Sequence, residues 1–275
     1  MTKRRGPSFP FALVRALALA FAVAAGSCSQ KSAPAPAPPP ADAVEARGAA
    51  RESERAGEHA PGHHEHPREE APRDRGRTPA PTMSYLGADW LTRPERIEEE
   101  QPEKMLDALG IRRGMVVADI GAGVGYHALR IATRVGPEGR VYATDIQPEM
   151  LDMLRKSVRE QGLGNVTAVL STDAATGLPR GAIDLALMVD VFHELSAPER
   201  FLAGLKENLK GEGRLALVEF RGEDPSVPIR EEHKMTAAQV IRELDAAGFR
   251  LVERHEFLPW QHILIFAKTA PRSAP

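Results

Sequence analysis

The sequence predicts an α/β fold in which a mostly parallel β-sheet is covered by helices on both faces. Between residues 93 and 268, short apolar runs alternate with longer segments whose apolar residues recur at helical spacing. The runs are almost continuously apolar, which is typical of parallel strands buried on both faces. The last two runs are separated by Leu258-Pro259-Trp260-Gln261, a connection too short for a crossover helix. We therefore expect a doubly wound sheet of seven strands with one antiparallel edge strand.

Each predicted element has a local signal. The strands are expected at 115–120, 139–144, 166–170, 183–189, 213–220, 250–257 and 262–268. The helices are expected at 93–109, 126–135, 148–161, 198–209 and 237–247. Pro102 should break the first helical segment into two pieces, because proline lacks the N–H group that the helix needs. The apolar side of that segment carries Ile97, Met105, Leu106 and Leu109.

The N-terminal part of the chain differs from this globular region. Residues 29–82 contain ten prolines and a single large aliphatic residue, Val44. Such a stretch cannot bury enough apolar area to offset chain entropy. We therefore predict a disordered linker at 29–82, a single domain at 83–270 and a short tail at 271–275. The net charge of −2 disfavours a nucleic-acid partner, because nucleic-acid binders usually carry an excess of basic residues.

Four histidines, at positions 59, 63, 64 and 66, lie close together in the predicted linker. They could form a loose metal site or belong to a solvated polar tether. We favour the tether, because cysteines and an ordered scaffold are not predicted around them. The sequence alone therefore predicts no metal site.

The first 28 residues have the layout of a secretory signal. A basic start at Lys3, Arg4 and Arg5 precedes an apolar run at 16–25, which is short for a bilayer span. Cys28, the only cysteine, follows Ala25-Gly26-Ser27. This arrangement resembles a bacterial lipoprotein box, which implies lipidation of Cys28 and a membrane-anchored or exported protein. The alternatives are an ordinary cleaved signal, an uncleaved anchor, or a cytoplasmic protein whose translation starts near Met83.

A glycine-rich turn carries the chemical signal. Asp119-Ile120-Gly121-Ala122-Gly123-Val124-Gly125 joins the first predicted strand to a helix. Glycines allow a tight turn and close approach of a ligand, and the helix N-terminus offers free N–H groups. Asp145, at the end of the second strand, is suited to a bidentate contact with ribose hydroxyls. A dinucleotide site of the NAD type is less favoured, because Tyr126 stands where G-x-G-x-x-G needs glycine.

This turn resembles the first motif of class I S-adenosylmethionine-dependent methyltransferases, and is similar to the small-molecule group that includes the quinone-biosynthesis enzymes. The resemblance covers about residues 95–268. It implies a Rossmann-like sheet with the sixth strand inserted antiparallel at the edge. It also implies S-adenosylmethionine as cofactor and a small-molecule methyl acceptor that reacts at oxygen, nitrogen or carbon.

The family pattern also implies roles for individual residues. The amino-acid part of the cofactor would be held by Asp119 and by the backbone of Gly121, Ala122, Gly123 and Gly125. Asp145 would bind the ribose, Ile146 would pack on the adenine, Asp173 would accept from the adenine amino group, and Asp190 would face the methionine end. The alternative for each aspartate is a helix cap or a solvated turn.

His193 is the candidate catalytic residue. It lies in Val189-Asp190-Val191-Phe192-His193-Glu194-Leu195, which resembles the segment after the fourth strand of small-molecule methyltransferases. It could act as a general base on a hydroxyl or amine, or serve as a structural histidine that caps the following loop. The acceptor pocket is expected from Trp90, the first helix, the loop after His193 and residues 221–235, where Arg230 or His233 could contact substrate.

Two further observations constrain the function. Residues 83–270 contain no cysteine, which excludes cytosine C5 methylation and an iron–sulfur radical mechanism there. An export signal on a domain for a cytosolic cofactor leaves a second hypothesis open. The protein could be an exported, non-catalytic lipoprotein that binds a nucleoside or S-adenosylmethionine.

Overall fold

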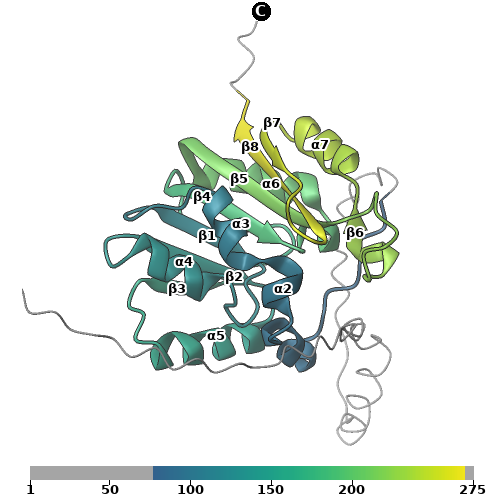
Figure 1. The fold of residues 1–275 in the computed structure, drawn as a ribbon. Helices are drawn as coiled ribbons and strands as arrows, with labels where there is room; N and C mark the ends of the chain where they lie inside the picture. The colour runs from purple at the N-terminus through teal and green to yellow at the C-terminus, as the bar shows by residue number, and fades with distance from the viewer. Residues whose placement is uncertain (1–76, 270–275) are drawn as a thin grey trace, which may run out of the picture. The chain divides into compact units, whose positions relative to one another are not determined.

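The computed structural model describes residues 77–269 (Figure 1). The predicted signal at 1–28 with Cys28, the linker as far as residue 76 and the tail at 271–275 lie outside the described residues. The predictions made for them therefore stay predictions. None of the helices within 77–269 combines the length and the apolar character needed to cross a bilayer.

The centre of the domain is one sheet. Its strands are β1 (Val116–Ile120), β2 (Arg140–Asp145), β3 (Val166–Leu170), β4 (Ile183–Val189), β5 (Leu209–Arg221), β7 (Phe249–His255) and β8 (Gln261–Lys268). They lie in the order β3-β2-β1-β4-β5-β8-β7. A two-residue strand, β6 (Lys234–Met235), pairs with β5 outside this path. The seven predicted strands are all present within one to four residues of their expected bounds.

The strand directions agree with the predicted fold class, but the reversed strand is not the one that was expected. β1 to β5 pair in parallel, whereas β8 pairs antiparallel with both β5 and β7. A mostly parallel sheet with an antiparallel pair at its edge is thus confirmed. The reversed strand is β8, the seventh predicted strand, and not the sixth. The short connection from β7 reverses the chain, so β8 occupies the place between β7 and β5.

Helices cover both faces of the sheet (Figure 1). The helices are α2 (Arg96–Glu100), α3 (Pro102–Ala108), α4 (Ala128–Val135), α5 (Pro148–Glu160), α6 (Pro198–Asn208) and α7 (Ala237–Ala246). One buried cluster joins α3, α4 and α5 to strand residues such as Leu185 and Leu187. Another joins α6 and α7 to the alternate residues Ala186 and Met188. Successive side chains of β4 therefore enter opposite cores, as the two-residue period of a strand requires.

The first helical segment breaks at Pro102, as predicted. The helix before Pro102, however, does not bury the apolar side chain that was expected to face the core. Met105, Leu106 and Leu109 are buried, whereas Ile97 is 58% exposed. The five-residue helix α2 instead buries charged side chains, because Arg96 donates two hydrogen bonds of 2.7 Å to the Glu100 carboxylate. A paired charge of this kind can be buried where an isolated one cannot.

Residues 77–84, which we call the N-terminal strap, contact the domain. Arg77 donates to the carbonyl oxygens of Phe192 (2.6 Å) and Leu195 (2.8 Å) and to Glu243. The Ala80 N–H donates to the His193 carbonyl oxygen at 3.1 Å. Residues 77–82 fall within the predicted linker, yet in the structure they pack on the domain. The strap leads into the short 3-10 helix η1 (Tyr85–Thr92), which no sequence signal predicted.

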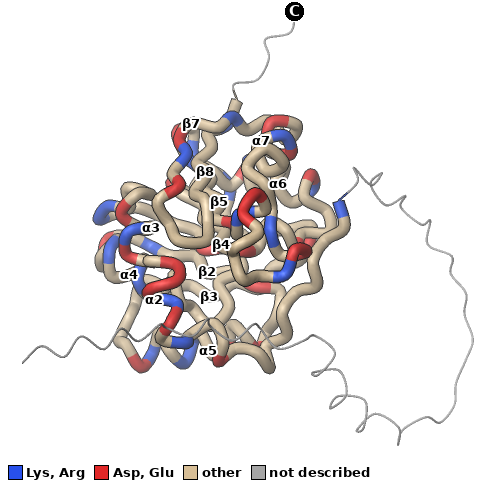
Figure 2. The backbone as a smooth tube through the Cα atoms, turned by 45° about the vertical axis from the view of Figure 1, so that its right-hand side comes forward, with Lys and Arg blue, Asp and Glu red and all other residues tan. Residues whose placement is uncertain are grey.

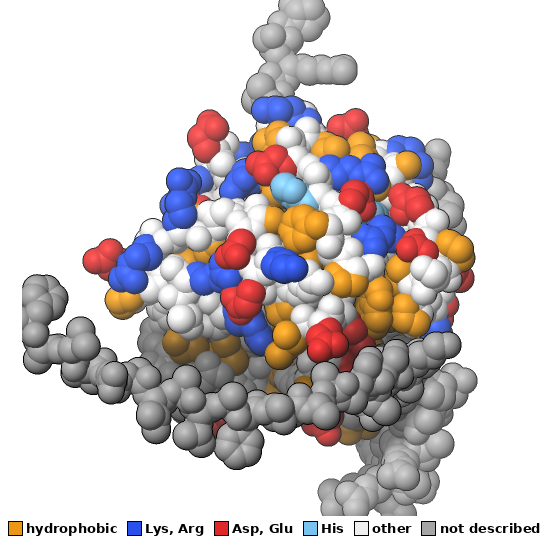
Figure 3. Space-filling model, in the orientation of Figure 1, with side chains coloured by type: hydrophobic (Ala, Val, Ile, Leu, Met, Phe, Trp, Pro, Cys, Tyr) orange, Lys and Arg blue, Asp and Glu red, His pale blue; other side chains and the backbone are white. Residues whose placement is uncertain are grey.

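Charges of both signs are distributed over the described domain. Acidic and basic residues are interspersed along its helices and loops (Figure 2). On the face seen in Figure 3, side chains of both signs alternate with small hydrophobic groups. In these views the acidic and basic residues are mixed and do not gather into a patch of one sign.

Candidate active site

A cavity of about 710 Å³ lies at the carboxyl ends of the parallel strands. It is lined by residues that follow β1, β2, β3 and β4, which is the place where open α/β sheets bind ligands. Its other walls come from the strap, η1 and the segment 229–233 that ends in the 3-10 helix η3 (Glu231–His233). The cavity therefore joins segments from both ends of the described chain.

The glycine turn after β1 forms part of the cavity wall. Gly121 and Gly123 have φ angles of 66° and 53°, which disfavour any other L-residue. A Cβ atom on Gly121 would lie 2.4 Å from Val191 Cγ2, and one on Gly123 would lie 2.9 Å from Leu91 Cδ1. Both glycines are thus required by conformation and by space.

Gly125 has a different role from the first two glycines. A Cβ atom there would lie 2.4 Å from Leu154 Cδ1 of α5, so this glycine allows α4 and α5 to pack closely. Gly121 and Gly123 line the cavity, whereas Ala122, Gly125 and Asp119 are not among the lining residues. The Ala122 N–H bonds to the Thr144 carbonyl oxygen, which ties the turn to β2.

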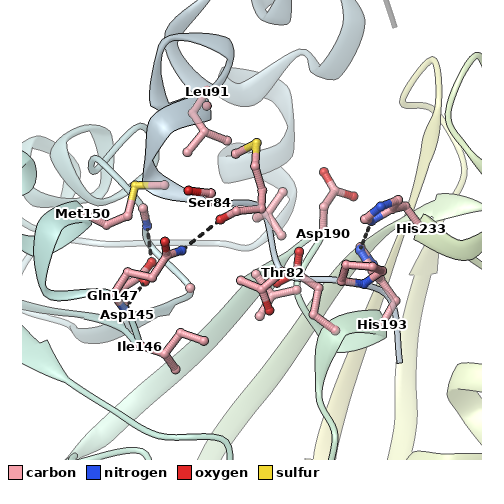
Figure 4. Close-up of a pocket in the computed structure, with 18 of the residues that line it drawn as sticks. Thr82, Ser84, Leu91, Asp145, Ile146, Gln147, Met150, Asp190, His193 and His233 are labelled. Atoms are coloured by element: carbon pink, nitrogen blue, oxygen red, sulfur yellow. Dashed lines mark hydrogen bonds between the residues drawn. The ribbon is translucent and has the colours of Figure 1, made fainter. Parts of the chain in front are cut away.

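Asp145 connects the glycine turn to the end of β2. Its Oδ2 accepts from the Gly123 N–H and its Oδ1 accepts from the Gln147 N–H, both at 2.9 Å. Burial raises the pKa of this carboxyl, and the backbone hydrogen bonds partly counteract that shift. Gln147 in turn donates to the Met83 carbonyl oxygen and so holds the strap over this part of the cavity (Figure 4).

The other predicted nucleoside contacts also lie at the cavity. Ile146 is 41% exposed and lines it beside Asp145. Asp173 lines it from the loop after β3 and accepts a hydrogen bond of 3.0 Å from Ser196 Oγ. The turn after β3 therefore lies near the segment that follows η2.

Two carboxyl groups, those of buried Asp119 and half-buried Asp190, each have one buried oxygen without a hydrogen-bond partner. Asp119, only 2% exposed, leaves Oδ2 unpaired, and burial raises its pKa to about 7. Asp190 accepts from Gln261 Nε2 at 2.7 Å through Oδ2 and leaves Oδ1 unpaired. Burial first, and then Glu100 and Glu219, raise the pKa of Asp190 well above its usual range. Such oxygens suit a ligand that brings positive charge, because an unpaired buried acceptor is costly.

These features fit S-adenosylmethionine. Gly121 and Gly123 line the cavity with backbone alone, Asp145 and Asp173 line it beside them, and Asp190 carries a free oxygen where cationic groups could be received. Asp190 itself adopts a φ angle of 54°, a strained value for a non-glycine residue. Strain of this kind is concentrated at functional sites.

His193 lies in the same cavity and is held by a buried acid. Its Nδ1 is 2.6 Å from Glu219 Oε2, and Glu219 Oε1 accepts from the Phe192 N–H at 2.8 Å. The ring belongs to the 3-10 helix η2 (Phe192–Glu194), whereas Glu219 belongs to β5. Burial alone would lower the pKa of His193, but the Glu219 carboxylate more than offsets this and leaves the pKa raised.

A second histidine faces the first. His233 Nδ1 lies 3.2 Å from His193 Nε2, and the two rings are perpendicular with centroids 5.2 Å apart (Figure 4). Burial and the neighbouring His193 lower the pKa of His233 to about 4. Next to this pair, burial raises the pKa of Glu194 to about 7. The site therefore holds several groups able to exchange protons near neutral pH.

The sequence predicted part of the acceptor side of the cavity correctly. Trp90, Leu195, Arg230 and His233 line it as expected. Arg221 does not; it donates to the carbonyl oxygens of Leu258 and Gln261 and so fixes the turn before β8. Glu219 was missed, although a carboxylate within the apolar stretch of a buried strand is itself a signal. The strap was missed because its contacts are mainly hydrogen bonds from polar residues.

Comparison with known proteins agrees with this geometry. A family model described as a methyltransferase domain matches residues 117–213. Protein-L-isoaspartate O-methyltransferase from Methanococcoides burtonii is 37% identical over 97 residues, which are 35% of this chain and 47% of that protein. The ubiquinone/menaquinone biosynthesis C-methyltransferase UbiE from Serratia proteamaculans is 32% identical over 116 residues, which are 42% of this chain and 46% of that protein. The chain thus spans about half the length of these curated relatives.

Solved structures extend the likeness over most of the described domain. A SAM dependent methyltransferase from Aquifex aeolicus has a TM-score of 0.64 and 31% identity, covering 67% of this chain and 98% of that one. The [4+2]-cyclase SpnF has a TM-score of 0.53 at 17% identity, covering 62% of this chain and 80% of that one, and shares the fold. From the glycine turn, the sheet order and the coverage of the Aquifex protein, we conclude that the chain belongs to the class I S-adenosylmethionine-dependent methyltransferases, an enzyme family whose cofactor is S-adenosylmethionine.

Proposed function

We propose that the protein transfers the methyl group of S-adenosylmethionine to a small-molecule acceptor bound in the same cavity. The observation that carries this proposal is the continuity of that cavity. It is lined at one side by Asp145 and Ile146 and at the other by His193 and His233. A cofactor and an acceptor could therefore occupy one continuous space, and alignment of the two supplies much of the acceleration in a direct displacement.

On the cofactor side, the chain would bind and orient. S-adenosylmethionine, when bound, supplies a methyl group on a positively charged sulfur. Asp145 and Asp173 would hold its nucleoside, and the backbone of Gly121 and Gly123 would approach it closely. Asp190, with its unpaired Oδ1, would receive positive charge from the methionine end. The same charge would favour the ionised form of this carboxyl.

On the acceptor side, His193 would take a proton from an acceptor oxygen or nitrogen. Glu219 would hold the ring in one orientation and stabilise the imidazolium that forms, because its Oε2 lies 2.6 Å from Nδ1. Glu219 does not itself line the cavity and is a positioning residue. An acceptor that reacts at carbon would use the same base for a proton next to the reacting centre.

The walls of the cavity support a small acceptor. Residues 81–84 of the strap, Trp90 and Leu91 of η1, and Ile229, Arg230 and His233 all contribute to it. The strap and η1 reach the Asp145 side, where Gln147 donates to the Met83 carbonyl oxygen, whereas His233 lies beside His193. The isoaspartate methyltransferases among the relatives carry a protein acceptor in their name, so an isoaspartyl peptide is the comparison substrate.

A calorimetric titration tests the cofactor assignment. We expect S-adenosylmethionine to bind the full-length chain and Asp145→Ala to weaken it about 100-fold, roughly 2.7 kcal/mol, through lost contacts to the ribose and to the glycine turn. Asp152→Ala is the matched control, because Asp152 on α5 pairs with Arg155 at the surface. Equal affinities of wild type and Asp145→Ala would overturn the assignment.

Labelled cofactor then separates the hypotheses about turnover. We expect transfer of labelled methyl to a component of a metabolite extract and not to an isoaspartyl peptide. Transfer to the peptide alone would replace the small-molecule acceptor by a protein acceptor. Binding without transfer to either would favour the second hypothesis, an exported non-catalytic lipoprotein that binds a nucleoside or S-adenosylmethionine.

For localisation we propose export and lipid anchoring through Cys28. The support is the lipoprotein-like sequence at residues 25–28. A chain that starts at Met83 would also lack Arg77 and Ala80, whose hydrogen bonds hold the strap on η2. Cell fractionation is the test. The full-length protein should be found with membranes and Cys28→Ala should be released, whereas a soluble pool that the substitution leaves unchanged contradicts the proposal.

A further inference from the structure

Three side chains with metal-ligating atoms meet at the acceptor side of the cavity. His193, Glu194 and His233 each offer one ligand atom, and these atoms all lie within 4.8 Å of one another. The two histidines come from η2 and η3, which are 40 residues apart, and their rings point toward each other in Figure 4. All three residues line the cavity.

The distance between the two imidazole nitrogens fits a shared cation. His193 Nε2 and His233 Nδ1 are 3.2 Å apart. Two bonds of about 2.0–2.1 Å from one metal ion to these atoms would enclose an angle of about 100°, close to the tetrahedral value. The perpendicular rings at 5.2 Å between centroids keep the remaining ring atoms apart. The two nitrogen atoms are therefore already as far apart as two ligands of one metal ion would be.

The hydrogen bond between His193 and Glu219 is of the kind that metal-bound histidines usually make. Ligating histidines usually donate their other ring N–H to a carboxylate, which fixes the tautomer and leaves the lone pair free for the metal. Glu219, fully buried, takes this place with Oε2 at 2.6 Å from His193 Nδ1. Its Oε1 accepts from the backbone N–H groups of Phe192 and Val191, so the acid is itself held in place.

Glu194 is also held. The Thr82 hydroxyl and the Met83 N–H of the strap donate hydrogen bonds to its carboxylate. A carboxylate oxygen can accept more than one hydrogen bond or coordinate a metal beside one. The strap thus fixes the third ligand as Glu219 fixes the first. Three ligand residues would leave one position of a tetrahedral ion open, and all three residues line the cavity.

We propose that His193 Nε2, His233 Nδ1 and the Glu194 carboxylate bind a divalent transition-metal cation, with Zn²⁺ as the best match, and leave one coordination position open toward the cavity. Two imidazoles and one carboxylate are a donor set that Zn²⁺ uses in catalytic sites. With the metal bound, His193 Nε2 is occupied and cannot also act as the base of the proposed methyl transfer. If that transfer is right, the open position would receive an oxygen atom of the acceptor, and the cation would take over the role of the base by lowering the pKa of that oxygen. The metal site itself does not depend on that transfer.

The four histidines at positions 59, 63, 64 and 66 require a special control, because they could bind metal independently. Zn²⁺ binding is therefore measured by calorimetry on the full-length chain and on a full-length background in which these four residues are replaced by alanine. All further variants are made in that background. Mg²⁺ serves as a hard cation that this donor set should bind weakly.

We expect the background protein to bind one Zn²⁺ per chain. His233→Ala should lower the affinity at least 100-fold, and Glu219→Gln should lower it about 10–100-fold, the usual effect of losing a carboxylate partner of a ligand. His255→Ala, a histidine on β7 that pairs with Glu253, is the matched control and should leave the affinity unchanged. Circular dichroism checks that each variant is folded.

The proposal is overturned by either of two results. Loss of Zn²⁺ binding in the background protein would place the metal at the four N-terminal histidines. Unchanged affinity in His233→Ala would remove His233 from the ligand set, and the two histidines would then form a hydrogen-bonded pair without a metal. Methyl transfer is not part of this readout, so failure of the proposed function and failure of the metal site can be told apart.

Discussion

The two sides of the cavity are built in different ways. On the nucleoside side, Gly121 and Gly123 lie in the turn that directly follows β1, and Asp145 ends β2. The Gly123 and Gln147 N–H groups donate to the Asp145 carboxylate and hold this side together. On the histidine side, His193 depends on Glu219, 26 residues away, and faces His233, 40 residues away. The first side is determined by local turn geometry, whereas the second exists only after the sheet has formed.

This difference has an energetic consequence. A strained turn fails when a side chain is added, because both its conformation and its close contacts resist the change. A buried charged pair fails when one partner is altered, because the other partner is left without compensation. Substitutions matched to each mechanism should therefore separate the two sides.

The largest effect is expected at the glycine turn. Gly121→Ala should lower the free energy of unfolding by about 3 kcal/mol, because Gly121 has a φ angle of 66° and its Cβ would lie 2.4 Å from Val191 Cγ2. Gly204→Ala in α6 is the control; its Cβ would have open space, so helix propensity should stabilise the protein by up to about 1 kcal/mol. Urea unfolding measures both. Equal effects at the two positions would contradict the role given to the turn.

On the histidine side, Glu219→Gln should cost about 2 kcal/mol of folding stability. The substitution keeps the shape but removes the charge beside His193 and brings an NH₂ group toward backbone donors. Glu253→Gln, at an exposed position on β7, should change stability by less than about 0.5 kcal/mol. The same denaturation series tests the pair. A neutral Glu219→Gln would mean that His193 does not need this acid for its position.

The strap should make a smaller contribution. Arg77→Ala removes hydrogen bonds to the Phe192 and Leu195 carbonyl oxygens and to Glu243, and should cost about 1–2 kcal/mol. Arg180→Ala breaks an exposed ion pair with Glu207 and should cost less than about 0.5 kcal/mol. Protection of the amides of residues 192–195 from hydrogen exchange should fall in the first variant alone. Unchanged protection would show that the strap does not hold η2.

The effect expected to be smallest at neutral pH is a pH dependence at His233. Its pKa is lowered from 6.5 to about 4, so between these values the unfolded chain takes a proton that the folded chain refuses. Stability should fall as the pH is lowered through this window, and more steeply for the wild type than for His233→Asn. The cause is burial first, followed by His193 and Arg230, with Glu232 opposing them. Urea unfolding at several pH values, with a chelator present, checks the difference; parallel curves would contradict it.

The fold could be predicted from the sequence in most respects, because its elements have local signals. The apolar run of β4 and the proline at the start of α5 fix their bounds to within a residue. The identity of the reversed strand could not be obtained in this way, since it depends on which neighbour β8 selects. Ile97 was misplaced because the sequence does not show that Arg96 and Glu100 would pair in the interior.

The candidate site, like the fold, could be predicted from the sequence only in part. The glycine turn and Asp145 are consecutive with their strands, and the structure brings Gly121, Gly123, Asp145, Ile146, Asp173 and Asp190 to one cavity. Their roles in binding remain predictions. Glu219 and the facing of His193 and His233 depend on strand order and on the path of residues 221–233. Asp119 illustrates the opposite case, since it belongs to the resemblance but lies outside the cavity lining.

The strap has a mechanical consequence. It reaches the site from the N-terminal side, where Arg77 and Ala80 are bonded to η2 and where Thr82 and Met83 are bonded to Glu194. Tension applied to the chain at residue 77 would be borne first by these few bonds. The earliest part of the domain to yield would thus be the part that holds His193 and Glu194, long before the sheet is loaded. The wall of the cavity that carries His193 would therefore be the first to give way under tension from the N-terminal side.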